Sequence, residues 1–482
     1  MKPPVPRCGW EGTCGTMGTP SPRAVLVLAA ALAGLSAPRA AHGQPNFIVI
    51  LADDVGWGDL GANWAETKET PHLDEIKAPR AAGASWAMAG GYRSGINSET
   101  MFCGFHAGKW HLGHHGHHHP SFRGFDYYFG IPYSHDMGCT DTPGYNLPPC
   151  PPCPRHSAAA RVARKDCYTE VALPLFENVT IVQQPVNLSS LAARYAEEAA
   201  RFIRRASGSG RPFFLYLALA PMHVPLEGPP PPPASGRGDN GPWAQKCELA
   251  GCLGPFLGAW QRQRGGSSAK QTTWEGGHRV PALAYWPGRI PAKRTSPALL
   301  STLDIFPTLV ALAGAALPPN RRFDGLDVSP VLFGWSDVGH KVLLHPNSGA
   351  AGKDGEIAAL RLAQYKAFYT TGGAMACDGS IGPAEHHQPP LIFNLDRDIQ
   401  EQEPLDVASR EYQAVLPAIS RAYAQALEDI ATDNVSLADY SQDPAVTPCC
   451  NAEHVACRCR APGSRAAALG HRAEQRATRL CL

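Results

Sequence analysis

The sequence predicts an α/β protein with a second, smaller α+β domain. Residues 46–52 (NFIVILA) form a short apolar run rich in β-branched side chains, which is typical of a strand buried on both faces of a parallel sheet. Ser190 can cap an amphipathic helix that continues to about Arg204, and the apolar run 212–220 (PFFLYLALA) predicts another buried strand. A helix followed by an apolar strand is the alternation of a βαβ unit.

The second half of the chain predicts a further helix over residues 300–313 and then shorter, less apolar runs. Residues 367–371 and 391–395 are such runs, and we expect them to be strands of the smaller domain. The predicted organisation is a signal peptide over 1–43, a catalytic-type domain over 44–333 with atypical segments at 77–107 and 228–238, a C-terminal domain over 334–460 and a disordered tail over 461–482.

Composition and the N-terminus restrict the class of protein. The 482 residues carry 43 basic and 42 acidic side chains, and this net charge of +1 argues against a nucleic-acid binder. Residues 24–35 (AVLVLAAALAGL) are too short to cross a membrane, which takes ~20 residues. They fit the apolar region of a secretory signal better than a buried core helix, the alternative. No later segment predicts a membrane span.

The cysteine content agrees with an oxidising compartment. The chain has 15 cysteines. They cluster at Cys139, Cys150, Cys153 and Cys167, and again at Cys449, Cys450, Cys457 and Cys459. Disulfides are favoured for a secreted chain, although a zinc site or, at Cys150-Pro-Pro-Cys153, a redox motif would use similar spacing. Glycosylation acceptors occur at Asn178, Asn187 and Asn434.

Polar side chains follow the two predicted buried strands where ligands of α/β sheets bind. Asp53 and Asp54 come directly after 46–52, and His223 follows 212–220. Two adjacent carboxylates can bind a hard divalent cation or cap the following turn. Asp239 and Asn240 supply a second pair of oxygen ligands. This donor set suits Ca²⁺ or Mg²⁺ rather than zinc.

A lysine and a histidine in Gly108-Lys-Trp-His111 could add charge neutralisation and proton transfer. Lys109 and His111 would then act on an ester oxyanion. Taken alone, the tetrapeptide is more often a surface lysine and a half-buried histidine. Residues 111–119 hold six histidines in nine positions. A solvated loop is favoured there over a transition-metal site, because metal ligands need enforced geometry.

Five motifs together give a resemblance to a known family. They are 46–61 (NFIVILADDVGWGDLG), 108–115 (GKWHLGHH), 130–136 (GIPYSHD), 239–241 (DNG) and 270–288 (KQTTWEGGHRVPALAYWPG). In this order they resemble the sulfatase family over residues 45–459. The resemblance implies an alkaline-phosphatase-like α/β fold with a large mixed sheet between helices and a smaller C-terminal α+β domain. It also implies hydrolysis of sulfate esters, including those of glycans, in the lysosome reached through the endoplasmic reticulum, or after secretion.

The same resemblance implies roles for individual residues. Asp53, Asp54, Asp239 and Asn240 correspond to the Ca²⁺ ligands, Lys109, Ser134, His223 and Lys270 to the substrate-binding residues, and Lys109, His111 and His223 to the catalytic residues. The family nucleophile is a formylglycine hydrate, made from a cysteine by the formylglycine-generating enzyme. It attacks sulfur and expels the alcohol.

The chain departs from the family pattern at this nucleophile. Members have a Cys-x-Pro-Ser-Arg motif between the Asp-Asp strand and Gly-Lys-Trp-His, whereas residues 77–107 contain none and lack a clear period. Cys103 is followed by Gly-Phe-His-Ala, and Cys459 begins Cys-Arg-Ala-Pro-Gly. Residues 229–233 are all proline, where members have a strand leading into Asp-Asn-Gly.

These departures leave several readings open. A mis-spliced or mis-predicted coding sequence is favoured over a genuine inactive paralogue, because the intact motifs flank stretches of low pattern. The chain as written is therefore expected to be inactive. Two alternatives to a sulfatase are a pseudo-sulfatase that binds sulfated ligands without turnover and a phosphate-ester hydrolase of the same superfamily. The latter would need a directly encoded Thr or Ser nucleophile, and none lies in a matching motif.

Overall fold

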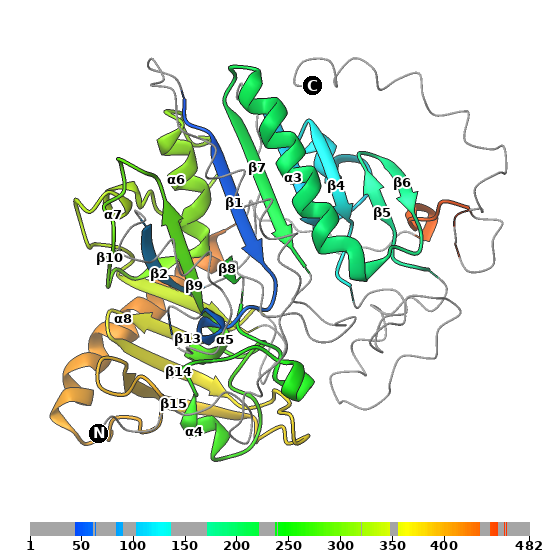
Figure 1. The fold of residues 1–482 in the computed structure, drawn as a ribbon. Coiled ribbons are helices and arrows are strands. Elements are labelled where there is room, and N and C mark those ends of the chain that lie inside the picture. Colours follow the sequence, from blue (N-terminus) through cyan, green and yellow to red (C-terminus); the bar gives the residue numbers. More distant parts are fainter. Residues whose placement is uncertain are drawn as a thin grey trace, which may run out of the picture. The chain divides into compact units, whose positions relative to one another are not determined.

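Figure 1 shows the fold of the chain in a computed structural model. The chain divides into two compact units. The structure describes residues 44–60, 63, 83–89, 103–135, 171–220, 237–238, 240–319, 321–347, 355–433, 444–451, 457 and 459. The first unit contains Thr19–Asp53, Gly95–Pro231 and Ser441–Leu482, and the second contains Met1–Gly18, Asp54–Ser94 and Pro232–Tyr440. The predicted signal peptide, the tail from 461, the cysteine cluster at 139–167 and Asn434 lie outside the described residues. The domain boundary near residue 333 remains a prediction.

The first unit is built on a mixed sheet with the strand order β6-β5-β4-β3-β7-β1. The strands are β1 (Phe47–Ala52), β3 (Cys103–Lys109), β4 (Tyr127–Ile131), β5 (Leu175–Glu177), β6 (Thr180–Gln183) and β7 (Phe213–Leu219). β1, β7, β3 and β4 run parallel to their neighbours, while β5 and β6 are antiparallel. The sequence-based expectations of strands at 46–52 and 212–220 are confirmed.

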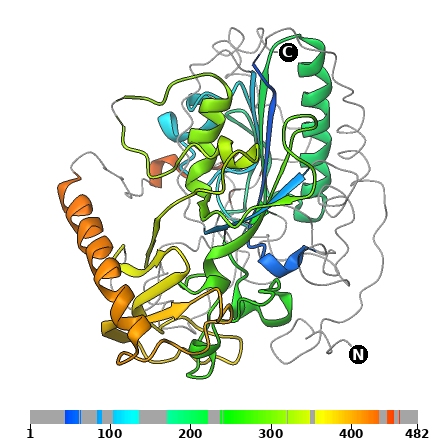
Figure 2. The same ribbon diagram turned by 90° about the vertical axis from the view of Figure 1, so that its left-hand side faces the viewer.

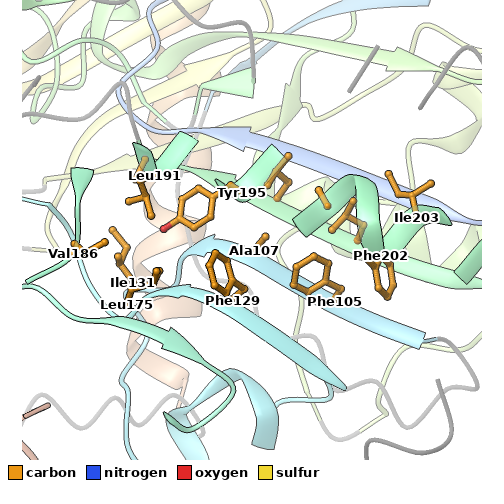
Figure 3. Close-up of a cluster of buried hydrophobic side chains, with 14 of the residues drawn as sticks. Phe105, Ala107, Phe129, Ile131, Leu175, Val186, Leu191, Tyr195, Phe202 and Ile203 are labelled. Carbon is orange, nitrogen blue, oxygen red and sulfur yellow. The ribbon is translucent and has the colours of Figure 1, made fainter. Parts of the chain in front are cut away.

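Helix α3 (Leu191–Gly208) covers one face of this sheet. Leu191, Tyr195, Ala199, Phe202 and Ile203 lie on its apolar stripe and are buried, as their helical spacing predicts. Figure 3 shows these side chains packed against those of the sheet, among them Phe105, Phe129 and Ile131. The helix begins after the short 3₁₀ helix Leu188–Ser190, where the Asn187 side chain accepts a hydrogen bond from the Ser190 amide. This helix packs against β3, β4 and β7.

The second unit contains two sheets, of which the first is mixed. Strand β2 (Gly83–Ala89) pairs antiparallel with β9 (Arg279–Tyr285) and parallel with the short strands β10 (Arg294–Thr295) and β11 (Leu300–Ser301). Helix α6 (Ile305–Leu312) is shorter than the predicted 300–313, because Leu300–Ser301 is a strand and the Ser301 side chain caps a 3₁₀ turn at Thr302–Asp304. A further short helix, α7, spans Ser329–Leu332.

The other sheet of this unit is antiparallel and forms the expected C-terminal α+β structure. Its order is β12 (Val342–Pro346), β13 (Ile357–Leu362), β14 (Tyr365–Thr371) and β15 (Glu385–Asn394). Helix α8 (Arg410–Thr432) packs against it through Tyr412 and Ile419, and Figure 2 shows this helix in orange beside the yellow strands. The shorter elements of the chain are β8 (Arg237–Gly238), α4 (Ala259–Arg262), α5 (Glu275–His278) and the 3₁₀ helices Trp57–Asp59, Gly116–His118, Pro120–Phe122, Ala244–Leu249 and Pro444–Val446.

Residues 77–107, whose sequence has no clear period, contain one strand and most of another. Strand β2 spans Gly83–Ala89, and strand β3 begins at Cys103 and lies between β7 and β4. β3 is buried on both faces, and its glycine and alanine residues hide the apolar run that a central strand usually shows. Position 104 favours glycine, because an added Cβ would lie 2.9 Å from the carbonyl oxygen of Gly124.

The described cysteines form disulfides, as favoured over zinc. Cys449 pairs with Cys457, Cys450 with Cys459, and Cys247 with Cys377. The buried Gln184 side chain holds the C-terminal pair beside β6, since it donates to the Pro448 carbonyl and accepts from the Cys450 amide. No helix in the described part of the chain is both long and apolar enough to cross a membrane.

Candidate active site

Two predicted site residues meet at the carboxyl edge of the first unit's sheet. Asp53 follows β1, and its amide donates to the Leu219 carbonyl at the end of β7. Lys109 ends β3 on the other side of β7, and its ammonium Nζ lies 2.6 Å from Asp53 Oδ2. Both side chains are largely buried. A buried carboxylate is thus neutralised by an ammonium group that the neighbouring strand supplies.

Gly108 is what allows β3 to end in this way. Its φ is +121°, and an added Cβ would lie 1.9 Å from the Ala218 carbonyl oxygen of β7. No side chain fits there without moving one strand. The Gly-Lys-Trp-His motif therefore begins with a glycine because the two strands approach closely just before Lys109.

The other predicted residues of this unit follow the same edge. Ser134 comes after β4 and is buried, and the amides of Trp110 and His111 donate to the carbonyls of Ile131 and Pro132. Lys109 and Ser134 are thus carried by adjacent parallel strands. His111 has a positive φ of 57° and an exposed side chain, so it stands at the open side of the edge.

The second unit holds a matching cluster around Asp54. Lys270 Nζ lies 2.5 Å from Asp54 Oδ1, and Asn240 Nδ2 donates to the same oxygen at 2.8 Å. Asp54 is 6% exposed. Residues 54, 240 and 270 are far apart in sequence, so this convergence is produced by the fold. It supports the interpretation of all three as site residues.

The loop after Asp54 is fixed by a carboxylate that the sequence-based reasoning overlooked. Asp59 is buried, and its two oxygens accept hydrogen bonds from the amides of Gly56 and Cys252. Asp54 itself has a φ of +59°, a conformation that aspartate tolerates better than most residues. The signal for Asp59 was its place in the Gly-Trp-Gly-Asp turn directly after the strand.

Trp243 is a second overlooked residue of this cluster. The Lys270 ammonium lies 5.4 Å from the centre of its indole ring, within reach of a cation–π interaction. The indole ring therefore lies beside the Lys270 ammonium group. Its position three residues after Asn240 was the available signal.

Each lysine–carboxylate pair offers oxygen ligands and an ammonium group, which suits an anion bound next to a cation. Asp53 and Asp54 are consecutive in the chain and buried, and each faces a lysine. Hard divalent cations take carboxylate and amide oxygens, so these residues fit Ca²⁺. The described residues contain no group of three His, Cys, Asp or Glu side chains arranged for a metal. His223 and Asp239 lie outside the described residues.

The histidine-rich tract is a surface loop, as favoured. His115, His117 and His118 are exposed in Gly116–His118 and its flank. His119 is the buried member: its ring packs against Tyr128, and burial lowers its pKa to about 4. This ring caps a 3₁₀ turn by accepting from the Ser121 amide. Its role there is structural.

Comparisons with known proteins identify the family of the chain. A family model described as "Sulfatase" matches residues 238–315, and one described as "C-terminal region of aryl-sulfatase" matches residues 338–459. The chain is 56% identical to arylsulfatase G of Canis lupus familiaris over 492 residues, covering 87% of this chain and 92% of that protein. It is 33% identical to arylsulfatase A of Homo sapiens over 511 residues, covering 89% and 96%. The chain belongs to the sulfatase family and is by that membership a sulfuric ester hydrolase.

Solved structures share the fold. A sulfatase from Pseudoalteromonas sp., PsFucS1, superposes with a TM-score of 0.63 at 21% identity over 87% of this chain and 96% of that one. The structure of BT4656 "in complex with its substrate D-Glucosamine-2-N, 6-O-disulfate" gives 0.53 at 12% identity over 81% and 99%. The α/β fold with an antiparallel C-terminal sheet is thus confirmed as the sulfatase fold.

Proposed function

We propose that Lys109 and Lys270, each paired with a carboxylate, are sulfate-binding residues, and that the chain as written binds a sulfate monoester of a glycan without turning it over. The support for binding is the convergence of Lys109 on Asp53 and of Lys270 on Asp54. An ammonium group can attract a sulfate oxygen while remaining close to its carboxylate. BT4656, a protein of the same fold, has been solved in complex with its substrate D-glucosamine-2-N,6-O-disulfate, which favours sulfated sugars as ligands.

The donor set also supports Ca²⁺ at this site. Asp53, Asp54, Asp239 and Asn240 would hold the ion, which when bound would help to neutralise the charge of the ester oxygens. The side-chain amide of Asn240 would need to turn its oxygen toward the ion, a rotation that exchanges atoms of nearly equal size. Lys109 and Lys270 would contact the sulfate oxygens while remaining close to their carboxylates.

The remaining site residues would bind and move protons. Lys270 and Ser134 are candidates for holding the sulfate oxygens. His111 is exposed and can exchange a proton with a leaving alcohol at the open edge, with His223 as a second candidate. All of these groups stabilise charge, but none of them replaces a nucleophile that attacks sulfur.

The observation that carries the lack of turnover is the state of the cysteines. All of the described ones, namely Cys103, Cys247, Cys252, Cys377, Cys449, Cys450, Cys457 and Cys459, are in disulfides. Cys103, which lies before Gly108, is also fully buried at the start of β3. A thiol held in a disulfide offers no substrate for the formylglycine-generating enzyme, and the sequence carries no Cys-x-Pro-Ser-Arg motif. Under this proposal, covalent catalysis through formylglycine would be unavailable to the chain.

Secretory-pathway features complete the proposal. The disulfides, the apolar run 24–35 and the acceptor sites at Asn178 and Asn187 favour a glycoprotein that enters the endoplasmic reticulum and is delivered to lysosomes or secreted. Asn187 is exposed on a turn before α3, where a glycan could be accommodated.

Grafting tests the proposed function. The chain would receive a family Cys-x-Pro-Ser-Arg segment in place of residues 77–102 and a family strand before Asp239, with co-expression of the formylglycine-generating enzyme. We expect the graft to hydrolyse an aryl sulfate, and the same graft with Cys→Ala at the motif to be inactive. A graft that folds, carries formylglycine and binds Ca²⁺ yet shows no hydrolysis would contradict the assignment of the remaining site residues.

A genuine pseudo-sulfatase, rather than a mis-spliced form of an active enzyme, is the second candidate, and one observation favours it. The lysine–carboxylate pairs are intact although the nucleophile is missing. A pseudo-sulfatase would keep such groups to bind sulfated ligands. Repeated transcripts that lack a Cys-x-Pro-Ser-Arg segment between residues 75 and 108 would support this reading, whereas transcripts that contain the segment would support an active enzyme.

A further inference from the structure

A buried network of charges lies five residues beyond Lys270, outside the site itself. Its centre is Glu275 of α5, which is 2% exposed. Lys366 Nζ of β14, fully buried, lies 2.8 Å from Glu275 Oε1, and Arg279 Nε lies 2.7 Å from Oε2. Arg361 of β13 reaches the same Oε2 at 3.2 Å. Burial alone would raise the pKa of Glu275, but Lys366, Arg279 and Arg361 hold it well below its usual range.

A second buried carboxylate closes the network. Glu401 Oε2 accepts a hydrogen bond from the Glu275 amide at 2.8 Å, and Glu401 Oε1 lies 3.4 Å from Lys366 Nζ. Burial raises the pKa of Glu401 to about 7, against the attraction of Lys366. Glu401 thus fixes the first amide of α5, while Lys366 fixes the Glu275 side chain. We call Glu275, Lys366 and Glu401 the α5 clamp.

Helix α5 in turn holds the segments that carry two site residues. The Gly241 amide, next to Asn240, donates to the Gly277 carbonyl at 2.9 Å. The Lys270 amide donates to the Pro242 carbonyl at 3.0 Å, so both segments are joined to each other as well. Gly277 packs so closely that an added Cβ would lie 2.6 Å from the Ala269 carbonyl oxygen. A displacement of α5 must therefore displace Lys270 and Asn240.

The C-terminal sheet holds the same segments at a second point. The disulfide Cys247–Cys377 attaches the chain after Asn240 to the connection between β14 and β15. The Ser267 amide, three residues before Lys270, donates to the Ala374 carbonyl in that connection. Both site segments are thus attached to the connection between β14 and β15 of the antiparallel sheet.

We propose that the α5 clamp is a positioning device of the C-terminal sheet, which holds Lys270 and Asn240 at the Asp54 carboxylate. The inference rests on the proposed function, since it assigns these residues to the sulfate site. Simple stability is a weaker explanation, because a buried ion pair is often no more stabilising than apolar side chains of the same volume. Directed hydrogen bonds instead fix the orientation of a short helix that has only four residues.

The test uses the full chain with the charge-balanced double substitution Lys366→Met/Glu401→Gln. Methionine fills the space of lysine, and glutamine can still accept from the Glu275 amide. The control is Arg397→Gln, which removes the exposed ion pair between Arg397, shortly after β15, and Glu411 of α8. Hydrogen exchange by mass spectrometry follows peptides over 240–243 and 267–278, with α8 as an internal reference. Calorimetric titration with inorganic sulfate gives the second readout.

In the double variant we expect exchange in 240–243 and 267–278 to rise on the order of tenfold while α8 is unchanged, and sulfate to bind on the order of tenfold more weakly. The control should match the unaltered chain in both. Unchanged exchange in these peptides, or an equal rise in α8, would overturn the positioning role. If the double variant fails to fold, the single variant Glu401→Gln is tested instead. We expect a smaller rise of hydrogen exchange in the same two peptides. Absence of sulfate binding by the unaltered chain would contradict the proposed function, while the exchange result would still decide the positioning role.

Discussion

Lys270 and Asp54 are 216 positions apart in the chain, and Lys270 Nζ lies 2.5 Å from Asp54 Oδ1. The carboxylate is almost fully buried, and Asn240 donates to the same oxygen. A buried carboxylate that attracts both groups gathers the three segments of the second unit that carry predicted site residues. The Lys270 ammonium group lies next to the proposed anion-binding position. Its removal should therefore lower both the stability of the fold and the affinity for the anion.

Replacing Lys270 by methionine should abolish most sulfate binding. The substitution removes one charge-assisted contact to the anion, for which we expect an affinity loss of about ten- to a hundredfold. It also removes the ammonium group that faces the buried Asp54 carboxylate, so the free energy of unfolding should fall. Calorimetric titration with inorganic sulfate measures the first effect. Lys341→Met, at an exposed lysine of the same unit, serves as the control. Equal affinity in Lys270→Met and the unaltered chain would remove Lys270 from the site.

Calcium should bind this chain much more weakly than it binds a relative with an intact nucleophile segment. One family ligand is missing from the sequence, and the strand that directly precedes Asp239, β8, has only two residues (Arg237–Gly238). Fewer ligands and a less rigid site both lower Ca²⁺ affinity. Titration of the purified chain and of the graft, side by side, checks this. Tight, stoichiometric binding by the ungrafted chain would argue against the account of the metal site.

His106 should make the protein less stable as the pH falls. Its ring is fully buried among aromatic side chains, including Trp110, Tyr128 and Tyr216, and burial lowers its pKa to about 3. Below the unfolded-state pKa of about 6.5 the unfolded chain gains a proton that the folded chain does not, so stability is lost as pH falls from that value toward 3.

His106→Phe should therefore flatten the pH dependence of unfolding. Between pH 7 and 5 the unaltered chain should lose roughly 2 kcal/mol more than the variant, from 1.36 kcal/mol per pH unit below 6.5. Chemical unfolding at the two pH values measures this, with the exposed His115→Gln as the control. A variant that loses as much stability as the unaltered chain would show that His106 is protonated, or solvated, in the folded state.

Gly108 should tolerate no side chain, whereas Gly116 should tolerate one. Both have positive φ, but an added Cβ at Gly108 would lie 1.9 Å from the Ala218 carbonyl, while nothing lies within 4 Å at Gly116. We expect Gly108→Ala to cost about 3 kcal/mol or more, and Gly116→Ala about 1 kcal/mol, from backbone strain alone. Comparing the unfolding midpoints of the two variants separates the cost of the clash with β7 from the cost of the positive φ. Similar midpoints would mean that β3 and β7 can separate without cost.

The parts of the fold that the sequence predicts are those with strong periodicity. The run 46–52 and helix α3 could be recognised because bulky apolar side chains mark one strand and one helical stripe. Strand β3 could not, since Gly104, Ala107 and Gly108 fill a crowded sheet interior where small size replaces apolar bulk.

The site was predictable to a different extent. Asp53, Asp54, Lys109 and Lys270 stand in recognisable motifs, and the structure brings them together in pairs. Asp59 accepts a hydrogen bond from the Cys252 amide, 193 residues away along the chain. Glu275 accepts one from the buried Lys366, 91 residues away. Local spacing carries no information about such contacts, so only the folded structure shows them.

The central claim is that this chain has the binding groups of a sulfatase without its nucleophile, and one measurement tests it most directly. The purified, ungrafted chain, co-expressed with the formylglycine-generating enzyme, is assayed with a chromogenic aryl sulfate at acidic pH. Charge stabilisation without a nucleophile retains only a small part of enzymatic rate. We predict hydrolysis at the background rate, equal to that of a Lys109→Ala/Lys270→Ala variant. Robust turnover that this double substitution abolishes would contradict the account and show that another residue attacks sulfur.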